Sequence, residues 1–238
     1  MRSPAVISGK VFSTGFLAIA LLFSPGCGNG NGKTAALPGH ADTGSVRTES
    51  SAGRTGTGTP VAFDSAAIIK SRGEKDAALR TMEGSPIPEA ERGTFSGLLY
   101  YPPSRAMVFN LGIEKITPPE PINLLATRGD MRPFHRYGKF SFTIDGTPCT
   151  LTAFISDDHP TSLFVPFKDA TNGSETYEVG RYIDLEETSD GHYRLDFNEA
   201  YNPYCAYNNA YTCPIVPAEN ILHAPIRAGE KLPAIGAH

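Results

Sequence analysis

Acidic, thiol and phenolic side chains that could do chemistry gather late in the chain. The segment 197–220 holds four tyrosines, five asparagines and two cysteines between prolines. A core element would contain more Val, Ile and Leu, and a linker would not carry four aromatic rings that it cannot bury. The composition therefore predicts a loop of one specific shape, whose rings either pack against the protein or form the rigid walls of a pocket.

A hairpin is predicted just before this segment, and each of its two strands contains an aspartate, Asp184 or Asp196. The turn Ser189-Asp190-Gly191 predicts a three-residue loop with its glycine in the left-handed conformation. In this register Leu185 and Leu195 continue an apolar face, and Asp184 lies directly opposite Asp196 on the polar face. Opposed carboxylates repel each other unless a cation, a donor or a shared proton lies between them.

This polar face is a candidate site with three alternative roles. The carboxylates hold a hard cation through oxygen ligands, they hold a polar ligand with donor groups, or Arg194, other basic side chains or backbone donors neutralise them in a structural network. The neighbouring Arg181 is predicted to form a salt bridge at the edge of the core, opposite Glu199, or an anion clamp. The residues of the hypothetical ligand site are Arg181, Tyr182, Asp184, Asp196, Asn198, Tyr201, Asn202 and Tyr204.

Cys205 and Cys213 close a short loop within the same segment. In an exported protein such a pair can form a disulfide, and the alternative is two free, packed thiols. A zinc site lacks a second Cys/His pair at suitable spacing, and no sequence signature supplies a base for a catalytic Cys205. The pair is therefore a candidate for a disulfide.

Established catalytic motifs are absent from the sequence. It contains no Gly-rich phosphate loop, no nucleophile elbow and no metalloprotease helix, and it identifies no cofactor. Specific loop residues are abundant, whereas a nucleophile and a base at recognisable spacing are missing. This balance favours a module of the cell envelope that binds a small ligand or an ion or has a structural role. The alternative is an enzyme of unrecognised type that uses the Asp184/Asp196 polar face.

The N-terminal residues predict export. Arg2 and Lys10 precede an apolar run, residues 16–23, that is too short to span a bilayer, and residues 1–27 are predicted to be a signal peptide. Gly26-Cys27 is similar to the cleavage box of bacterial lipoproteins, in which the cysteine becomes the lipid-modified N-terminus. We expect an extracytoplasmic location with a lipid anchor in a bacterial membrane; the alternative is a soluble secreted or periplasmic protein.

Composition separates the rest of the chain into a stalk and a domain. Residues 28–60 contain 8 glycines and 9 serines or threonines and too few large apolar side chains to offset their chain entropy, which predicts a flexible stalk. Residues 61–238, including a short C-terminal tail, are long enough for one domain with its own core. The net charge of -4, the pI near 5.9 and the lack of a basic cluster argue against nucleic acid. The expected partners are a small molecule, an ion or an envelope component, and a membrane through the N-terminal lipid.

Local patterns predict a mainly β domain with one N-terminal helix. Thr59-Pro60 has the form of a helix cap, and the composition of residues 61–82 predicts a surface helix. From Phe95 onward, short alternating runs predict antiparallel sheets in a sandwich or a partly open barrel. In the clearest hairpin, Asp145-Gly146 forms a two-residue turn and places Cys149 among core residues.

Several motifs are similar to those of a known family. They are LFVPFKDATNG (163–173), ETYEVGRYID (175–184), DFNEAYNPYCAY (196–207) and the stretch from CP (213–214) to EN (219–220). Over about residues 61–232 the chain resembles the bacterial family catalogued as domain of unknown function 1684; Asn209 replaces an expected proline in a local turn. The family has no established activity. The resemblance therefore implies one domain and a shared surface formed by these motifs, without a mechanism.

We expect Cys27→Ser to release the protein from the membrane fraction, because this substitution removes the thioether that would carry the lipid. The measurement is the partition of the full-length protein between membrane and soluble fractions. Ser24→Ala retains the cysteine and should leave the protein in the membrane fraction. Wild-type protein that is already fully soluble would indicate simple secretion instead.

Overall fold

The computed structural model describes residues 63–234, so the predicted signal peptide and stalk lie outside the described residues. Within residues 63–234, most regular structure is β-strand in two antiparallel sheets, and the strands do not close into a barrel. The fold class predicted from the sequence is confirmed. In chain order the elements are α1 (Ser65–Thr81), α2 (Glu89–Arg92), η1 (Arg105–Met107), β1 (Val108–Leu111), β2 (Glu114–Leu125), β3 (Met131–Ile144), β4 (Thr147–Ser156), β5 (His159–Phe167), β6 (Arg181–Leu185), β7 (Tyr193–Asp196), η2 (Phe197–Glu199), η3 (Tyr204–Ala206) and η4 (Ala218–Asn220), where η marks a short 3-10 helix.

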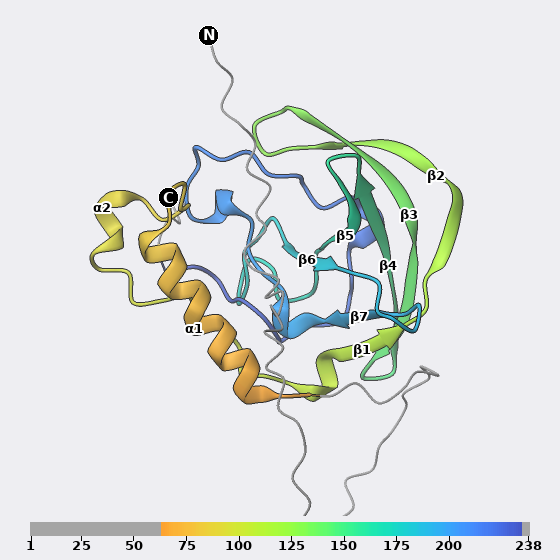
Figure 1. Cartoon of the computed structure of the whole chain (residues 1–238), viewed down its shortest axis with the longest axis horizontal. Helices are drawn as coiled ribbons and strands as arrows, with labels where there is room; N and C mark the ends of the chain where they lie inside the picture. Colours follow the sequence, from red (N-terminus) through yellow and green to blue (C-terminus); the bar gives the residue numbers. More distant parts are fainter. Residues whose placement is uncertain (1–62, 235–238) are drawn as a thin grey trace, which may run out of the picture. The chain divides into compact units, whose positions relative to one another are not determined.

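The larger sheet follows the order of the sequence. Its strand order is β2-β3-β4-β5-β6, and every neighbouring pair is antiparallel. Figure 1 shows β2, β3 and β4 as long, curved strands. β1 and β7 form a separate two-stranded sheet although they are distant in the sequence. This smaller sheet brings the start of the β region beside the segment that follows β6.

The β3–β4 hairpin confirms the register predicted from the sequence. Asp145 and Gly146 both have positive φ, at 47° and 79°, as a type I′ turn requires. Beyond the turn, Phe142 pairs with Cys149 and Phe140 pairs with Leu151. These side chains point into the core, where Cys149 is buried, so the structural role predicted for this thiol agrees with its position.

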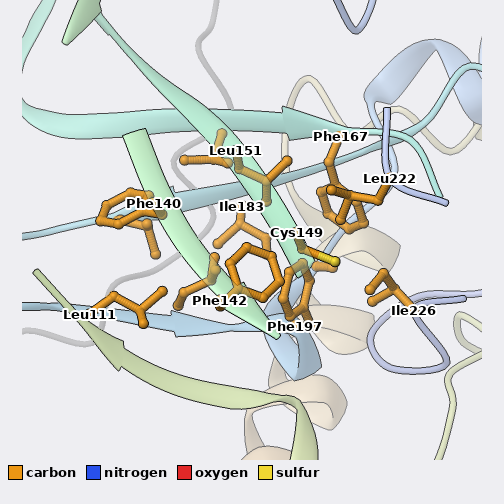
Figure 2. Packing of buried hydrophobic residues seen from close by; sticks show 14 of the residues in the cluster. Leu111, Phe140, Phe142, Cys149, Leu151, Phe167, Ile183, Phe197, Leu222 and Ile226 are labelled. Atoms are coloured by element: carbon orange, nitrogen blue, oxygen red, sulfur yellow. The ribbon is translucent and has the colours of Figure 1, made fainter. Parts of the chain in front are cut away.

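The main core lies between the two sheets and the late loops. Aromatic rings of β3 and the segment after β7 meet there, with Phe142 and Phe197 centred 5.7 Å apart. Figure 2 shows their packing with Ile183 of β6 and with Leu222 and Ile226 of the C-terminal region. Because both sheets and these last residues bury their apolar side chains in one cluster, the hydrophobic effect holds them together.

α1 lies on the surface (Figure 1) and is held by polar contacts and by a second hydrophobic cluster, in which its Leu79 packs with Ile87, Phe95 and Tyr207. It begins at Ser65 with Asp64 as its N-cap, whereas the predicted cap at Thr59 lies outside the described residues. The guanidinium of Arg72 donates to the backbone oxygens of Tyr101 and Asn198, at 2.7 and 3.1 Å. Leu79 is the buried residue of this helix, so an uneven apolar stripe was a correct indication of a surface helix.

A single amide fills a gap between β4 and β5. The side chain of Asn220 accepts from Thr152 N at 2.8 Å and donates to Thr152 O at 2.8 Å and Pro166 O at 2.7 Å. Pro166 has no N–H to offer a neighbouring strand, and the β4–β5 pairing, which includes Phe154 and Phe164, does not extend to Thr152 and Pro166. The buried Asn220 therefore replaces the missing strand contacts and fixes η4 against the larger sheet.

We expect Asn220→Ala to lower the free energy of unfolding by about 3 kcal/mol, because it leaves buried backbone groups of both strands unpaired. The measurement is equilibrium unfolding in urea. Asn123→Ala is the matched control, since Asn123 is an exposed residue of β2, and it should change stability by less than about 0.5 kcal/mol. Equal effects of the two substitutions would contradict the role given to Asn220.

Candidate functional site

The tyrosine- and asparagine-rich segment starts in the main core, where Phe197 and Ala200 are buried, and then contacts the larger sheet at several places. It first contacts β6, where Tyr182 and Tyr201 form a bridge. It then reaches the end of β2, where Pro214 bridges Ala126. Through η4 it returns to the β4–β5 gap. The segment is therefore anchored at several places along the chain, in agreement with the prediction of a loop of one specific shape.

The predicted pairing of Asp184 with Asp196 is wrong. The three-residue loop forms, with Gly191 at φ 77°, and the predicted register holds as far as a bridge between Glu187 and Tyr193. The two strands then separate. Asp184 pairs with Phe164 on β5 and is exposed, whereas Asp196 pairs with Val108 on β1 and is 1% exposed. The polar face that would have held a cation or catalysed a reaction does not form.

The apolar pattern of this region was correct although the pairing was not. Ile183, Leu185, Leu195 and Phe197 all enter the main core, as one hairpin face would predict. They reach it from two different sheets. Alternation of apolar and polar residues identifies which side chains are buried, but it does not identify the partner of each strand. β7 pairs with β1, an antiparallel strand that lies far away in the sequence.

Asp196 and Asn198 form a capping unit within the fold. Asp196 Oδ1 accepts from the backbone N and the side-chain Nδ2 of Asn198, at 2.9 and 2.8 Å. The carboxylate also forms an ion pair with Arg194 at 2.5 Å, as the structural alternative predicted. Asn198 in turn bonds both the N and O of Ser104, at 2.7 and 2.9 Å. These two candidate ligand residues therefore hold η2 to the segment before β1.

Asp184 and Tyr201 meet on the surface. The Tyr201 hydroxyl donates to Asp184 Oδ2 at 2.7 Å, and the ammonium of Lys75 lies 5.2 Å from the centre of the Tyr201 ring. Tyr182 packs edge-on against Tyr201 and donates its own hydroxyl to Pro214 O. Burial, and then the nearby Asp184 carboxylate, raise the pKa of Tyr201. Both phenols stay protonated at neutral pH and act as donors.

Arg181 holds the C-terminal strap, defined here as residues 226–230. Its side chain is fully buried, and Nη2 pairs with Asp169 Oδ2 at 2.8 Å. Its two Nη groups also donate to three strap carbonyls, those of Ile226, Ala228 and Glu230, at 2.5–3.0 Å. The predicted salt bridge is present, with Asp169 as its partner, and it is fully buried rather than at the edge of the core. The guanidinium's partners leave it no role as an anion clamp.

The strap carries a second buried charge, that of Glu230. Its carboxylate accepts from Lys75 Nζ at 2.5 Å, from the Tyr207 hydroxyl at 2.6 Å and from the backbone N of Asn202 at 2.7 Å. Burial and this carboxylate raise the pKa of Tyr207.

The other tyrosines of the segment also have packing partners: Tyr204 packs against Tyr211 with ring centres 5.3 Å apart. These tyrosines therefore pack against the protein and form hydrogen bonds, which is the first of the two roles predicted from composition.

Cys205 and Cys213 are free thiols that lie against each other. Cys213 Sγ accepts from the backbone N of Cys205 at 3.3 Å, and the Cys205 thiol lies 3.9 Å from the Tyr177 hydroxyl. The hydrogen bond with Cys213 lowers the pKa of Cys205 to about 7. The same hydrogen bond, together with burial, raises the pKa of Cys213. The structure therefore has the free, packed thiols of the alternative rather than the candidate disulfide, and the spacing indicated only that the two cysteines lie close together.

A hollow of about 250 Å³ lies between β2 and β3, away from the predicted ligand residues. β2 leaves the ladder after Lys115 and rejoins it at Glu120, with a cis peptide bond between Thr117 and Pro118. The bulged residues leave space lined by charges of both signs. The lining residues are Glu114, Lys115, Ile116, Glu120, Arg136, Lys139 and Glu219. The adjacent prolines 118 and 119 were the sequence signal for this irregular strand.

Within residues 63–234, no group of three His, Cys, Asp or Glu side chains is arranged to hold a metal ion. No helix in that part of the chain is long and apolar enough to cross a membrane. Two features of the described residues could therefore do chemistry: the small charged hollow beside β2 and β3, and the Cys205/Cys213 pair.

The fold and these sites define a mainly β protein with a tyrosine-rich segment anchored to its larger sheet. The chain belongs to the family described as Protein of unknown function (DUF1684), whose model matches residues 93–231. No protein with a curated description matches it.

A solved structure supports the same fold. The chain is similar to an uncharacterised protein of Haloarcula marismortui, from gene locus rrnAC0354, whose solution NMR structure has a TM-score of 0.56. The sequences are 36% identical, and the match covers 70% of this chain and 92% of the other. The family membership predicted from the motifs is confirmed over residues 93–231, and no activity is attached to it.

The different roles of the two aspartates are testable. Asp196→Ala should lower the free energy of unfolding by roughly 2–4 kcal/mol, because buried donors of Asn198 and the charge of Arg194 lose their acceptor. Asp184→Ala should leave stability close to that of the wild type, since water can replace the exposed carboxylate at the Tyr201 hydroxyl. Urea unfolding of both variants decides the matter: similar losses would contradict the separate environments described above.

Proposed function

We propose that this protein is a lipid-tethered binding module of a bacterial envelope that takes a small zwitterionic ligand, such as an amino acid or a short peptide, in the β2–β3 hollow. The observation that carries the proposal is this recess of about 250 Å³, lined by three carboxylates and three cationic side chains. Ligand pockets of drug-sized molecules occupy roughly 300–1,000 Å³, so a recess of this size suits a smaller ligand.

The charges around the hollow supply partners for both ends of a zwitterion. Arg136 and Glu219 already form an ion pair, with 2.9 Å between Nε and Oε1. Lys139 lies opposite Glu114 in the β2–β3 register, yet among the described side chains neither of them forms an ion pair. A carboxylate of the ligand would meet Lys139, and its ammonium group would meet Glu114 or Glu120. Charge-assisted hydrogen bonds of this kind are stronger than neutral ones.

The walls of the hollow are held by the fold, which favours a preformed site. Glu219 belongs to η4, and the next residue, Asn220, bonds the backbones of β4 and β5. Arg136 is a β3 residue paired with Phe154 on β4. A charged side chain that is already positioned loses less conformational entropy when a ligand binds.

Two other readings of the chain are less well supported. The enzymatic alternative relied on the Asp184/Asp196 face, and these side chains lie in different sheets with separate partners. Ion binding relied on the same pair. The tether remains a proposal from the sequence, which predicts an export signal, a lipidated Cys27 and a stalk; soluble secretion is its alternative.

The zwitterion dialanine should raise the melting temperature in a concentration-dependent manner, since a ligand that binds only the folded state stabilises it. Calorimetry should show that Lys139→Gln weakens dialanine binding about tenfold, the equivalent of ~1.4 kcal/mol. Lys70→Gln, which removes the same charge from exposed α1, should bind as the wild type does. N-acetyl-dialanine amide, which has no charge, should not bind.

Two outcomes would overturn the proposal. One is the absence of binding to the wild type by dialanine and by each of the amino acids glutamate, lysine and alanine at millimolar concentration. The other is binding that Lys139→Gln and Glu120→Gln leave unchanged, which would place the ligand elsewhere on the protein.

A further inference from the structure

Two thiols face each other beneath the tyrosine-rich segment. Cys205 is in η3, and Cys213 follows the loop closed by the packed rings of Tyr204 and Tyr211. The backbone N–H of Cys205 donates to Cys213 Sγ at 3.3 Å, so the two side chains are neighbours. Beyond Cys213, the chain is held to the end of β2 by the Ala126–Pro214 bridge. The fold therefore keeps the two sulfurs together.

The two sulfurs differ in their access to a reagent. Cys205 is partly exposed, whereas Cys213 is 7% exposed. The other described thiol, that of Cys149, is buried in the main core. Burial raises the pKa of Cys149. An external reagent therefore reaches Cys205 more easily than Cys213.

The surroundings of the pair also favour a thiolate at Cys205. The hydrogen bond from Cys213 lowers the pKa of Cys205 to about 7. The titratable groups that face the pair are the phenols of Tyr177 and Tyr182, and burial raises the pKa of both. These phenols remain protonated, so no other group around the pair changes charge near neutral pH. The thiolate is the form of cysteine that attacks a disulfide.

We propose that Cys205 and Cys213 are a thiol–disulfide exchange site that reduces low-molecular-weight disulfides. The Cys205 thiolate attacks one sulfur of the disulfide, a mixed disulfide forms at Cys205, and the other half leaves as a thiolate. Cys213 then gives up its proton to solvent and attacks Cys205 Sγ, which expels the second half. The protein loses two electrons and gains one disulfide, and the small disulfide becomes two thiols.

The short loop suits a reversible bond better than a permanent cross-link. A disulfide between these residues closes a loop with only 7 residues between the cysteines, Ala206 to Thr212. The chain-entropy stabilisation from a cross-link increases with loop length, so this one gains little from that source. The folded state is also formed with both thiols free, since the hydrogen bonds and ring contacts around them already position the loop.

The test uses the full chain with Cys27→Ser and Cys149→Ala, which leaves only the proposed pair. The probe is 5,5′-dithiobis(2-nitrobenzoate), a small aromatic disulfide that releases a coloured thiolate. We expect two coloured thiolates per chain and a product that retains no probe and has lost two hydrogens by mass spectrometry. The rate of the first release should rise with pH and reach half of its maximum near pH 7.

Single substitutions in this background separate the two roles. Cys213→Ser should release one thiolate and retain the probe at Cys205, because no second thiol resolves the mixed disulfide. Cys205→Ser should react at least tenfold more slowly at pH 7, because the remaining thiol is buried and keeps its proton. In wild-type protein, brief alkylation with iodoacetamide and peptide mapping should label Cys205 before Cys213 and Cys149, a measurement that requires no variant.

The proposal is wrong if the folded parent protein retains the probe without a second release, or reacts only in urea. It is also wrong if Cys205→Ser and Cys213→Ser react at the same rate. Melting curves of each variant establish that folded protein is being compared, and the alkylation of the wild type stands in for any variant that does not fold.

Discussion

The buried guanidinium of Arg181 is the interaction on which the rest of the fold depends. An uncompensated charge inside a protein is strongly destabilising, so the strap and Asp169 must be in place around it. The strap then brings Glu230 to Lys75 of α1 and to Asn202 of the tyrosine-rich segment. Gly229 allows this close approach, because its φ is 75° and a Cβ there would lie 2.6 Å from Ala200 O. One cation thus organises three distant parts of the chain.

The two proposed sites, the β2–β3 hollow and the Cys205/Cys213 pair, lie outside the network of contacts around Arg181. The residues that appeared most suited to bind a ligand, above all Arg181, Asn198 and Asn202, are engaged in holding the protein together. The stretch from Cys213 to Glu219 joins the thiol pair to one wall of the charged hollow. Its ends are held by the Ala126–Pro214 bridge and by Asn220. The segment therefore has a scaffolding role that its polar composition conceals.

Local signals predicted the fold better than they predicted the site. Asp145-Gly146 determines its hairpin because the turn and the pairing strands are adjacent in the sequence. The same reasoning failed for Asp184 and Asp196, because β7 pairs with β1, a strand from much earlier in the chain. The partners of Arg181 are mostly backbone carbonyls, which no residue type reveals. Only the nearness of Cys205 and Cys213 followed directly from their spacing.

The position of the strap late in the chain has a consequence for biosynthesis. Arg181 and Ile226 are separated by 45 residues, so a growing chain exposes the guanidinium well before its carbonyl partners exist. The β2–β5 hairpins have close partners and can form while synthesis continues, since local contacts require little loop closure. Until the strap has been synthesised, the guanidinium of Arg181 stays hydrated and the region around it cannot close. A chain that stops before the strap lacks the partners of this buried charge and should be degraded more readily, so residues 226–230 act as a check that synthesis has passed this point.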